Sequence, residues 1–409
     1  MTFSSLISVY VQGGLLRREM KPTTLDVTLA NKIRNILTLR YDPTGPSPLP
    51  VLRWSDFVEY QGISPLVQQL LENVTRRIVE EHRPAKIGVG ISGGVDSTTV
   101  LALTRKCFPD LEIKSYCITF GSDIKESKDA LHVSELYSTD HKDINIENPF
   151  SELEDQVKIV NEPRWNLYPY FLFREAARDC DLILTGDGGD ELFGGYVFRY
   201  AQVLGSGEAN VKSYLEAHAR DFVPDQKELF AIPFDWNSIH RILASYFSNP
   251  LPPLGKIFLA DYNGKLLYDF APTNAALSKH FGIRVKTPFL EPEVLHVATH
   301  LPYGLKYDPV NNLGKVILRQ ILLENFAYKA ATKGKIGWGM DLAEIWDKHI
   351  RSACEDLFES PRFVELGIIN RNWLKAGFER SDAHDLRYIG KMLGLLALEL
   401  WLKQAKLDR

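Results

Sequence analysis

Cysteine is scarce in this chain of 409 residues, and its four cysteines, Cys107, Cys117, Cys180 and Cys354, form no CxxC pair. The sequence therefore excludes a zinc ribbon, a dithiol redox motif and a fold held together by disulfides. Isolated cysteines of this kind are typical of intracellular proteins, so we expect buried, reduced thiols.

Long apolar runs and an excess of basic residues are also missing. The longest apolar stretch, residues 392–402, is interrupted by Glu399, and no basic residue precedes the apolar residues 6–11. This pattern favours neither a membrane helix nor a signal peptide. With 48 basic and 52 acidic residues the formal charge is -4, which provides no basic field for a phosphate backbone. We expect a soluble, cytoplasmic protein with no membrane and no nucleic-acid partner.

Short apolar strands alternate with helical segments over the first half of the chain. Apolar residues spaced by three and four predict a helix over residues 65–81. Strands separated by helices need crossover connections, so the pattern predicts an α/β fold with a parallel sheet. Ligands of such sheets bind beyond the carboxyl ends of the strands. The predicted strands are residues 86–91, 113–120, 141–146 and 181–185, and further helices are predicted at 98–106 and 126–137.

The rest of the chain divides by composition into less regular parts. We expect a short N-terminal segment of unknown role over residues 1–60, with a strand at 6–11, a helix at 25–37 and a proline-rich loop at 42–50. A nucleotide-binding region follows over 61–204. Residues 205–265 read as a connecting region, and 266–409 as a mainly helical part that ends in a packed helix over 388–401.

The strongest local signal is the string SGGVDS at residues 92–97, between a predicted strand and a predicted helix. Its two glycines let successive N–H groups face one concavity, and the following helix adds the positive end of its dipole. Ser92 and Ser97 can donate hydroxyls to phosphate, whereas Asp96 suits a phosphate site only with a cation between the two anions. The string predicts a phosphate site, and the absence of GxxxxGKS/T excludes a Walker loop.

A second string, TGDGGDELFGGY at residues 185–196, directly follows the fourth predicted strand. Its glycines permit close backbone approach, and Asp187, Asp190 and Glu191 come where the sheet opens onto a ligand. Clustered carboxylates are costly unless a cation neutralises them or they share a proton. The spacing of a calcium-binding EF-hand loop is not met, so we expect a ligand site of another kind, with either a cation or a shared proton at the carboxylates.

Together these strings resemble the synthetase domain of the class B asparagine synthetase family, and SGGVDS resembles the pyrophosphate loop of the ATP pyrophosphatases. The resemblance covers about residues 62–405. It implies a parallel-sheet domain of the adenine nucleotide α-hydrolase type followed by a mainly helical part, and cleavage of ATP to AMP and pyrophosphate. Further matching strings, in the family's order, are ITFG at 118–121, PFLE at 288–291, GKVILR at 314–319, KIGWG at 335–339 and LELWL at 398–402.

The resemblance also implies roles for individual residues. Asp96 and Asp190 would bind Mg²⁺, and Asp187 occupies the family's catalytic acidic position. Lys335 would stabilise charge on the α-phosphate and on the tetrahedral intermediate. The residues expected to bind ATP, through the pyrophosphate loop and through backbone and apolar contacts with AMP, are Ile91, Ser92, Gly93, Gly94, Asp96, Ser97, Ile118 and Gly186.

The chain departs from the family in two places. Glutamine-using members carry a nucleophilic cysteine directly after the initiator methionine, whereas residue 2 is Thr here and no cysteine precedes Cys107. We therefore expect no cysteine-dependent glutaminase in this chain. The segments that hold aspartate in the family are also altered, with a basic residue in place of an acid at position 284. We hypothesise a pocket for a larger or more anionic carboxylate, lined by Glu162, Trp165, Arg284 and Glu191.

These observations predict an ATP-dependent amide-forming ligase that adenylates a small-molecule or peptide carboxylate and transfers the acyl group to ammonia or an amine. The nitrogen source stays open between free ammonia, a separate glutaminase subunit and an amine of the substrate itself. The last case would be an intramolecular cyclase similar to the β-lactam synthetases or the lasso-peptide cyclases. A homo-oligomer also stays open.

Two alternatives belong to other classes of protein. A tRNA-modifying adenylating enzyme shares the pyrophosphatase fold, but its thiolating members need paired cysteines and a basic tract. A non-catalytic scaffold is the other alternative, and it is disfavoured because Asp96, Asp187, Asp190 and Lys335 are all retained.

Overall fold

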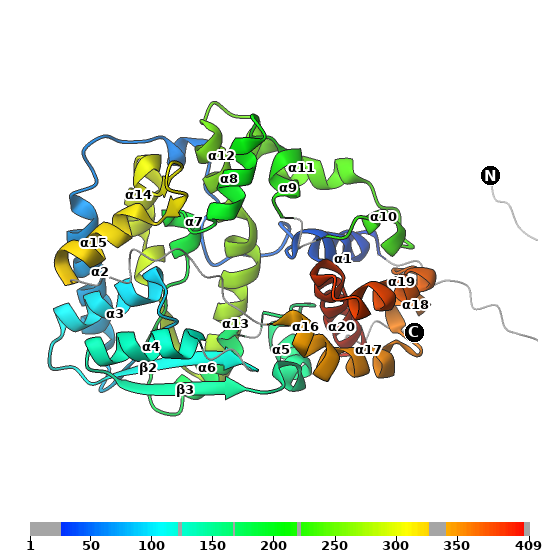
Figure 1. Ribbon diagram of the computed structural model, residues 1–409, viewed down its shortest axis with the longest axis horizontal. Coiled ribbons are helices and arrows are strands. Elements are labelled where there is room, and N and C mark those ends of the chain that lie inside the picture. Colours follow the sequence, from blue (N-terminus) through cyan, green and yellow to red (C-terminus); the bar gives the residue numbers. More distant parts are fainter. Residues whose placement is uncertain (1–25, 122–124, 167, 219–221, 327–340, 405–409) are drawn as a thin grey trace, which may run out of the picture.

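The computed structural model describes residues 26–121, 125–166, 168–218, 222–326 and 341–404 (Figure 1). Five strands form one parallel sheet in the order β3-β2-β1-β4-β5, which confirms the predicted α/β class. The strands are β1 (Ile87–Gly90), β2 (Ile113–Phe120), β3 (Asp140–Ile146), β4 (Leu182–Leu184) and β5 (Arg284–Lys286).

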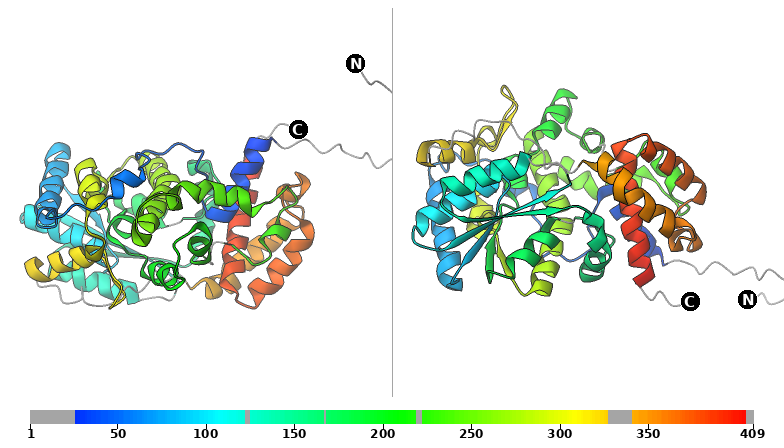
Figure 2. Two further views of the ribbon diagram at one scale, coloured as in Figure 1. Left: turned by 90° about the horizontal axis from the view of Figure 1, so that it is seen from above. Right: turned by 60° about the horizontal axis from the view of Figure 1, so that its bottom comes forward.

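Helices cover both faces of this sheet (Figure 2). On one face lie α2 (Leu66–His82), α3 (Val95–Cys107) and α4 (Lys125–Leu136), and on the other lie α6 (Tyr168–Ala176) and α13 (Ala271–Phe281). Successive strand residues point to opposite faces, so the buried side chains separate into two cores. Leu182 and Leu184 join the first core, whereas Ile183 between them joins the second. Because both faces are covered, β1 and β4 are apolar without alternation.

The fifth strand was not predicted from the sequence. β5 has only three residues, two of which are the charged Arg284 and Lys286, so neither its length nor its composition indicates a strand. It pairs with β4 in parallel register, and it lies in the part that was expected to be mainly helical. The sheet is therefore not confined to residues 61–204.

The described part of the predicted N-terminal segment packs into the rest of the molecule. Helix α1 (Val27–Leu39) lies against α20 (Leu386–Gln404), and Lys391 donates a hydrogen bond to the carbonyl of Leu37. Further along, the side chain of Asn263 accepts a hydrogen bond from Leu52 N at 3.0 Å and donates one to Leu52 O at 2.9 Å. Residues 26–60 thus link the C-terminal helices to the middle of the chain. The strand expected at 6–11 lies outside the described residues.

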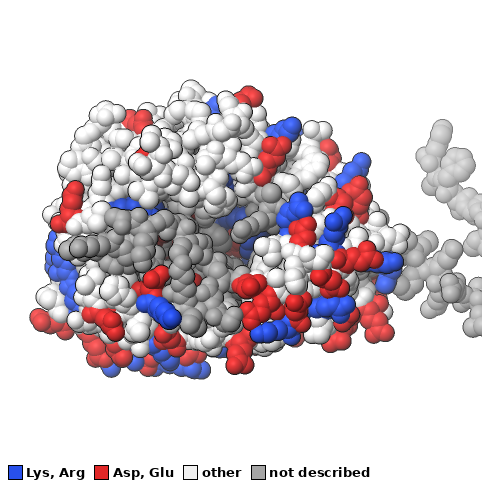
Figure 3. All heavy atoms as spheres, viewed as in Figure 1, with Lys and Arg blue, Asp and Glu red and all other residues white. Residues whose placement is uncertain are grey.

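The C-terminal helices form a group beside the sheet-bearing part (Figure 1). All four cysteines are buried and free, as predicted. Among the described residues, none of the helices combines the length and the apolar character needed to cross a membrane. On the face drawn in Figure 3, acidic and basic side chains are interspersed along the lower margin, and few charged side chains lie over the upper helices.

The other helices and short strands connect these layers. Short 3-10 or π-helical turns lie at Trp54–Phe57, Pro149–Glu152, Tyr262–Phe270, Pro288–Leu290, Tyr303–Leu305 and Trp346–Ile350. The remaining elements are α5 (Leu153–Val160), α7 (Gly189–Phe193), α8 (Val197–Gly205), α9 (Val211–Glu216), α10 (Gln226–Leu229), α11 (Trp236–Phe247), α12 (Pro253–Asp261), α14 (Pro292–His300), β6 (Tyr307–Asp308), β7 (Leu313–Gly314), α15 (Val316–Phe326), α16 (Leu342–Ile345), α17 (Arg351–Phe358), α18 (Arg362–Glu365) and α19 (Arg371–Asp382).

Candidate active site

The two predicted ligand loops follow neighbouring strands. β1 pairs with β2 on one side and with β4 on the other, so the direction in which successive strands are added reverses between β1 and β4. In parallel sheets this reversal opens a crevice at the carboxyl ends of the strands, where ligands bind. The loop with SGGVDS leaves β1 and the loop with GDGGDE leaves β4, so both reach this edge.

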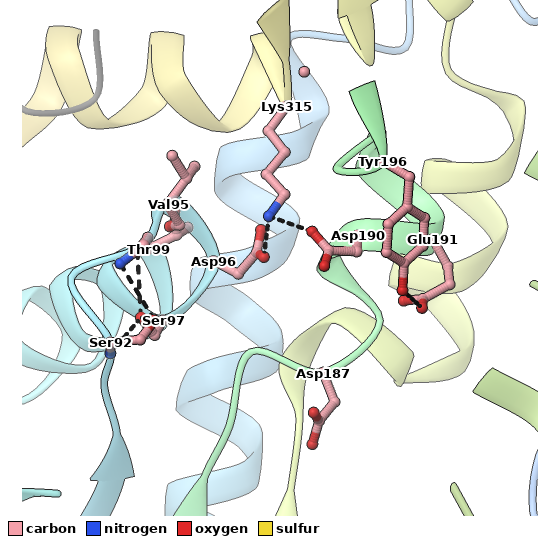
Figure 4. Close-up of polar contacts among 12 residues, drawn as sticks. Ser92, Val95, Asp96, Ser97, Thr99, Asp187, Asp190, Glu191, Tyr196 and Lys315 are labelled. Carbon is pink, nitrogen blue, oxygen red and sulfur yellow. Dashed lines mark hydrogen bonds and ion pairs between the residues drawn. The ribbon is translucent and has the colours of Figure 1, made fainter. Parts of the chain in front are cut away.

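The first loop turns tightly into α3, and its hydroxyl groups lie together (Figure 4). The Ser97 hydroxyl accepts a hydrogen bond from Ser92 N at 3.2 Å and lies 3.3 Å from the Ser92 hydroxyl. Gly94 N donates to the Ser92 hydroxyl at 3.3 Å. These long bonds keep the hydroxyls close to the amino end of α3, where the helix dipole favours an anion.

Glycines let the two loops touch each other and the helices beside them. A Cβ atom on Gly189 would lie 2.4 Å from Asp96 Cγ, and one on Gly186 would lie 2.9 Å from Asp96 Cβ. A Cβ atom on Gly93, whose φ is +69°, would lie 2.6 Å from Asp129 Cβ. A larger residue at these positions would push the loops apart, which explains why both strings are rich in glycine.

Asp96 and Asp190 come together on the ammonium of Lys315 (Figure 4). Lys315 Nζ lies 2.6 Å from Asp190 Oδ1 and also pairs with Asp96 Oδ2, and the lysine side chain is only 7% exposed. Burial alone would lower the pKa of Lys315, but the charges of Asp190 and Asp96 outweigh burial and raise this pKa above its ordinary value. The two residues predicted to bind metal therefore share one cation of the chain itself.

Asp187 points away from this ion cluster (Figure 4). Its Oδ2 accepts hydrogen bonds from the Thr185 hydroxyl at 2.8 Å and from the Asn274 amide at 2.9 Å, and its carbonyl accepts one from Thr287 at 2.9 Å. Burial raises the pKa of the Asp187 carboxyl, and the charge of Asp190 adds to the rise, whereas the two side-chain hydrogen bonds oppose it. This carboxyl is thus separate from the metal-binding candidates.

Glu191 belongs to a buried polar cluster behind the second loop. It accepts a hydrogen bond from the Tyr196 hydroxyl at 2.5 Å, and both line a small cavity of about 30 Å³ together with Tyr214 and Asp261. Burial, followed by the charge of Asp190, raises the pKa of Glu191 to about 8.

Ile91 and Ile118 have buried side chains, so only their backbone groups can reach a nucleotide. Ile91 N donates to Tyr116 O at 2.8 Å, one residue beyond the end of β1. The backbone N–H and C=O groups of successive residues point to opposite sides of a strand. Those of Ile118 therefore point to the same side as those of Tyr116, toward β1 but beyond its end. The position therefore suits a backbone contact with an adenine edge.

Of the four residues predicted to line a carboxylate pocket, Arg284 lies apart from the two loops. Glu162 pairs with Lys32 at 2.7 Å and with the buried Arg164, and Trp165 lies under the guanidinium of Arg40. Arg284 is exposed, lies at the amino end of β5 and pairs at 2.6 Å with Asp181, which precedes β4. Because this end of the sheet is opposite to the two loops, Arg284 is not part of the site, and the pocket that was inferred from it is wrong in that respect.

Three residues near the site were not predicted. Lys315 lay in a matching string, but a single lysine is usually a solvated surface residue and no role was assigned to it. Asn274 and Tyr168 carry no sequence signal at all. The Tyr168 hydroxyl lies 3.5 Å from the position of a Cβ on Gly90, at the carboxyl end of β1. Lys335, the other predicted catalytic residue, lies outside the described residues.

One protein family and several known proteins are similar to this chain. The family model described as asparagine synthase matches residues 66–403. The glutamine-hydrolysing asparagine synthetase 1 of Bacillus subtilis is 24% identical over 290 residues, which are 59% of this chain and 44% of the relative. Asparagine synthetase B of Escherichia coli is 21% identical over 308 residues, 69% of this chain and 46% of the relative. The chain spans less than half the length of these curated relatives.

Two solved structures show weaker similarity. An NMN synthetase from Francisella tularensis gives a TM-score of 0.25 at 18% identity, over 32% of this chain and 58% of that chain. A U34-tRNA thiolase from Methanococcus maripaludis gives a TM-score of 0.24 at 14% identity, over 67% of this chain and 87% of that chain. Neither score supports an argument about function.

Proposed function

Because the chain belongs to the asparagine synthase family, whose model matches residues 66–403, we propose that it is an ATP-dependent ligase that adenylates a carboxylate and converts it to an amide. The observation that carries this proposal is the convergence of the two loops on one ion cluster, in which Asp96 and Asp190 share the ammonium of Lys315. A phosphate-binding loop and two carboxylates at a sheet's switch point suit a nucleotide.

ATP would lie across the carboxyl ends of β1 and β2. Its phosphates would face the loop of residues 92–97, where two hydroxyls and the amino end of α3 are available. The adenine would lie beside Ile118, whose backbone groups point past the end of β1. Gly186, which lies against Asp96, would let the ribose and α-phosphate approach the second loop.

Asp96 and Asp190 also fit a Mg²⁺ ion. Both carboxylates reach the same ammonium nitrogen, so their oxygens converge on one point, and Mg²⁺ in nucleotide sites takes carboxylate and phosphate oxygens as ligands. We expect these two residues to hold the metal, which would supply positive charge beside the phosphates.

The reaction divides between the two sides of the second loop. A substrate carboxylate attacks the α-phosphorus, the bond to the bridging oxygen breaks, and pyrophosphate leaves toward residues 92–97. The amine then attacks the acyl carbon, AMP leaves with the electron pair of the bond to the acyl carbon, and the nitrogen loses a proton. Asp187 is suited to accept this proton because one carboxylate oxygen is anchored and the group faces away from the ion cluster. Lys335 keeps its proposed role at the α-phosphate on the resemblance alone.

The acceptor is the open part of the proposal. Because Arg284 lies at the opposite end of the sheet, it offers no basic group to a more anionic carboxylate. The nitrogen would come from free ammonia, from a separate glutaminase subunit or from an amine of the substrate.

A pyrophosphate-release assay tests the proposal. The chain is mixed with ATP, Mg²⁺ and a panel of carboxylates, with and without ammonium or simple amines. We expect pyrophosphate and AMP in equal amounts, with release that requires a carboxylate. Release of ADP, or no release with any carboxylate and amine pair, would count against a ligase of this class.

Two matched variants locate the activity. Asp190→Ala removes a carboxylate of the ion cluster, whereas Asp181→Ala removes the exposed carboxylate beside Arg284 at the other end of β4. We expect Asp190→Ala to abolish pyrophosphate release and Asp181→Ala to keep it. Full activity in Asp190→Ala would refute the assignment of the site.

A further inference from the structure

Lys315 is unusual both in its backbone conformation and in its position before a helix. Its φ is +59°, in the left-handed region that side chains other than glycine rarely adopt. It immediately precedes α15, and Arg319 N donates to its carbonyl at 3.0 Å, so a lysine occupies a capping position where Ser, Thr, Asp or Asn is preferred. Backbone strain of this kind persists where the surroundings enforce it and is concentrated at functional sites.

The surroundings hold this conformation on both sides of the residue. Lys315 N donates hydrogen bonds to Lys306 O at 2.7 Å and to Phe193 O at 3.0 Å, so both the β6–β7 hairpin and the end of α7 fix the backbone. The side chain passes Gly195, where a Cβ atom would lie 2.8 Å from Lys315 Cε and 1.8 Å from Asp190 Oδ1. In this arrangement the ammonium lies between Asp96 and Asp190.

This position is also the point on which the two candidate metal ligands converge. Two carboxylates and one ammonium carry a net charge of -1. A divalent cation added between the same carboxylates would come within a few ångströms of the ammonium, and like charges at that distance repel strongly in a partly buried site. Displacing the ammonium without giving it a new anionic partner would leave a buried unpaired charge, which is also unfavourable.

We propose that Lys315 is a resident cation that holds the metal position until ATP binds, so that the chain takes up its divalent metal together with the nucleotide and not before it. The triphosphate provides the missing partner, because the ammonium can turn from the carboxylates to a phosphate oxygen while the metal takes its place. The inference rests on the proposed function in one respect, namely that the loop of residues 92–97 receives phosphates.

Mn²⁺ is the probe for this order of binding, since its free and bound forms are distinguished by electron paramagnetic resonance. The full chain is titrated with Mn²⁺ alone and with Mn²⁺ plus a non-hydrolysable ATP analogue. For the native chain we expect weak binding of Mn²⁺ alone and binding of about one equivalent when the analogue is present.

Variants of Lys315 separate the resident cation from general effects. Lys315→Met removes the ammonium, and we expect it to bind Mn²⁺ without nucleotide about tenfold more tightly than the native chain does, or more. Lys315→Arg keeps the positive charge and should exclude Mn²⁺ as the native chain does. Lys315→Met combined with Asp190→Asn should lose the gained affinity because one ligand is missing.

A second lysine of the same hairpin provides the matched control. Lys306 is fully buried, and its ammonium lies over the rings of Phe57, Phe258 and Tyr303. Lys306→Met makes the same chemical change at an ammonium that lies among aromatic rings. It should therefore leave Mn²⁺ binding at the native level. Circular dichroism and thermal melting of each variant show whether it is folded.

The outcomes distinguish this inference from the proposed function. Equal affinity of native chain and Lys315→Met for Mn²⁺ alone, with both folded, would overturn the resident cation whatever reaction the chain catalyses. A second outcome is that Lys315→Met binds Mn²⁺ alone more tightly than the native chain does, but the ATP analogue adds no Mn²⁺ binding to the native chain. This outcome would overturn the order of binding and the proposed nucleotide site instead.

Discussion

Two side chains hold the Asp187 carboxylate at the same oxygen, Oδ2, which makes its proton affinity sensitive to single side chains. Thr185 and Asn274 both donate to Oδ2, and each of these bonds favours the charged form and lowers the pKa that burial raises. Asn274 is thus a positioning residue, because it acts on the reaction only through Asp187.

Replacing Asn274 should therefore shift the pH dependence of the reaction. With one donor removed, the pKa of Asp187 rises further, and the acid limb of the kcat/KM profile should move to higher pH in Asn274→Ala. Thr185→Val should move it in the same direction. The measurement is amide formation at saturating ATP between pH 5 and 9. Loss of rate without any shift of the acid limb in either variant would mean that Asp187 is not the group that titrates.

Glu191 makes a second prediction at the scale of one residue, on stability. Burial raises its pKa from the ordinary value of 4.5 to about 8 in the folded chain. Between these two pH values the folded chain keeps a proton that the unfolded chain has released, so the free energy of unfolding falls as pH rises through this window. Glu191→Gln cannot titrate and should lose less stability than the native chain as pH rises from 5 to 8.

Urea unfolding at several pH values measures this difference. Glu379→Gln, at a side chain that is 66% exposed, is the control and should follow the native chain at every pH. A stability difference between Glu191→Gln and the native chain that does not change with pH would refute the assigned pKa.

At the scale of the elements, the short helix α7 depends on its first residue. A Cβ atom on Gly189 would lie 2.4 Å from Asp96 Cγ, so Gly189→Ala must push α7 away from α3 and separate Asp96 from Asp190. We expect pyrophosphate release to fall by about tenfold or more, since displacements of about 1 Å at a reacting group cost about a hundredfold.

Gly205 supplies the comparison for this variant. It is the last residue of α8, and a Cβ atom there would meet nothing within 4 Å. Gly205→Ala should keep full activity and should be neutral or slightly stabilising, because alanine is the better helix former. Activity and melting temperature are measured for both variants. Normal activity in Gly189→Ala would show that the contact between the two loops is dispensable.

The elements that could be predicted from the sequence are those whose signal is local. The four strands β1 to β4 were predicted because each lies between helical segments, and their parallel order then placed the two glycine-rich loops at one edge of the sheet. β5 was missed because three residues with charged ends have no such pattern. Arg284 was assigned to the site on the resemblance, because it stands where the family has an acid, and β5 instead holds it at the opposite end of the sheet.

Residues whose role comes from a distant contact could not be predicted. Asn274 meets Asp187, 87 residues away in the sequence, because α13 packs beside β5. Lys315 meets Asp96 across 219 residues and through a backbone conformation that leaves no trace in composition or periodicity. Family resemblance identified its string, but only the folded chain brings its ammonium to the carboxylates.

At the scale of the whole molecule, the packing of α1 on α20 joins two ends of the described chain. Ile33 of α1 is fully buried in the second core, whereas Val27 at the start of the same helix is 73% exposed. We expect Ile33→Ala to lower the free energy of unfolding by about 3 kcal/mol, the usual cost of such a cavity, and Val27→Ala to change it by less than about 0.5 kcal/mol.

Urea unfolding measures these changes. The activity of the folded fraction should be unaltered in both variants, because the cavity that holds Glu191 is lined by Thr38 and Leu39 at the end of α1 and not by Ile33 or Val27. If Ile33→Ala instead lowers activity without lowering stability, α1 contributes to the site and not only to the fold.

The four buried cysteines have a use that does not depend on catalysis. Cys107 ends α3, Cys117 lies in β2, Cys180 precedes β4 and Cys354 lies in α17, so three report on the sheet-bearing part and one on the C-terminal helices. A thiol reagent can modify each only when its surroundings open. If the two cores unfold as one unit, all four should be alkylated at a common rate in mild denaturant. Faster alkylation of Cys354 would identify the C-terminal helices as a separately opening unit, and mass spectrometry of the tryptic peptides distinguishes the two cases.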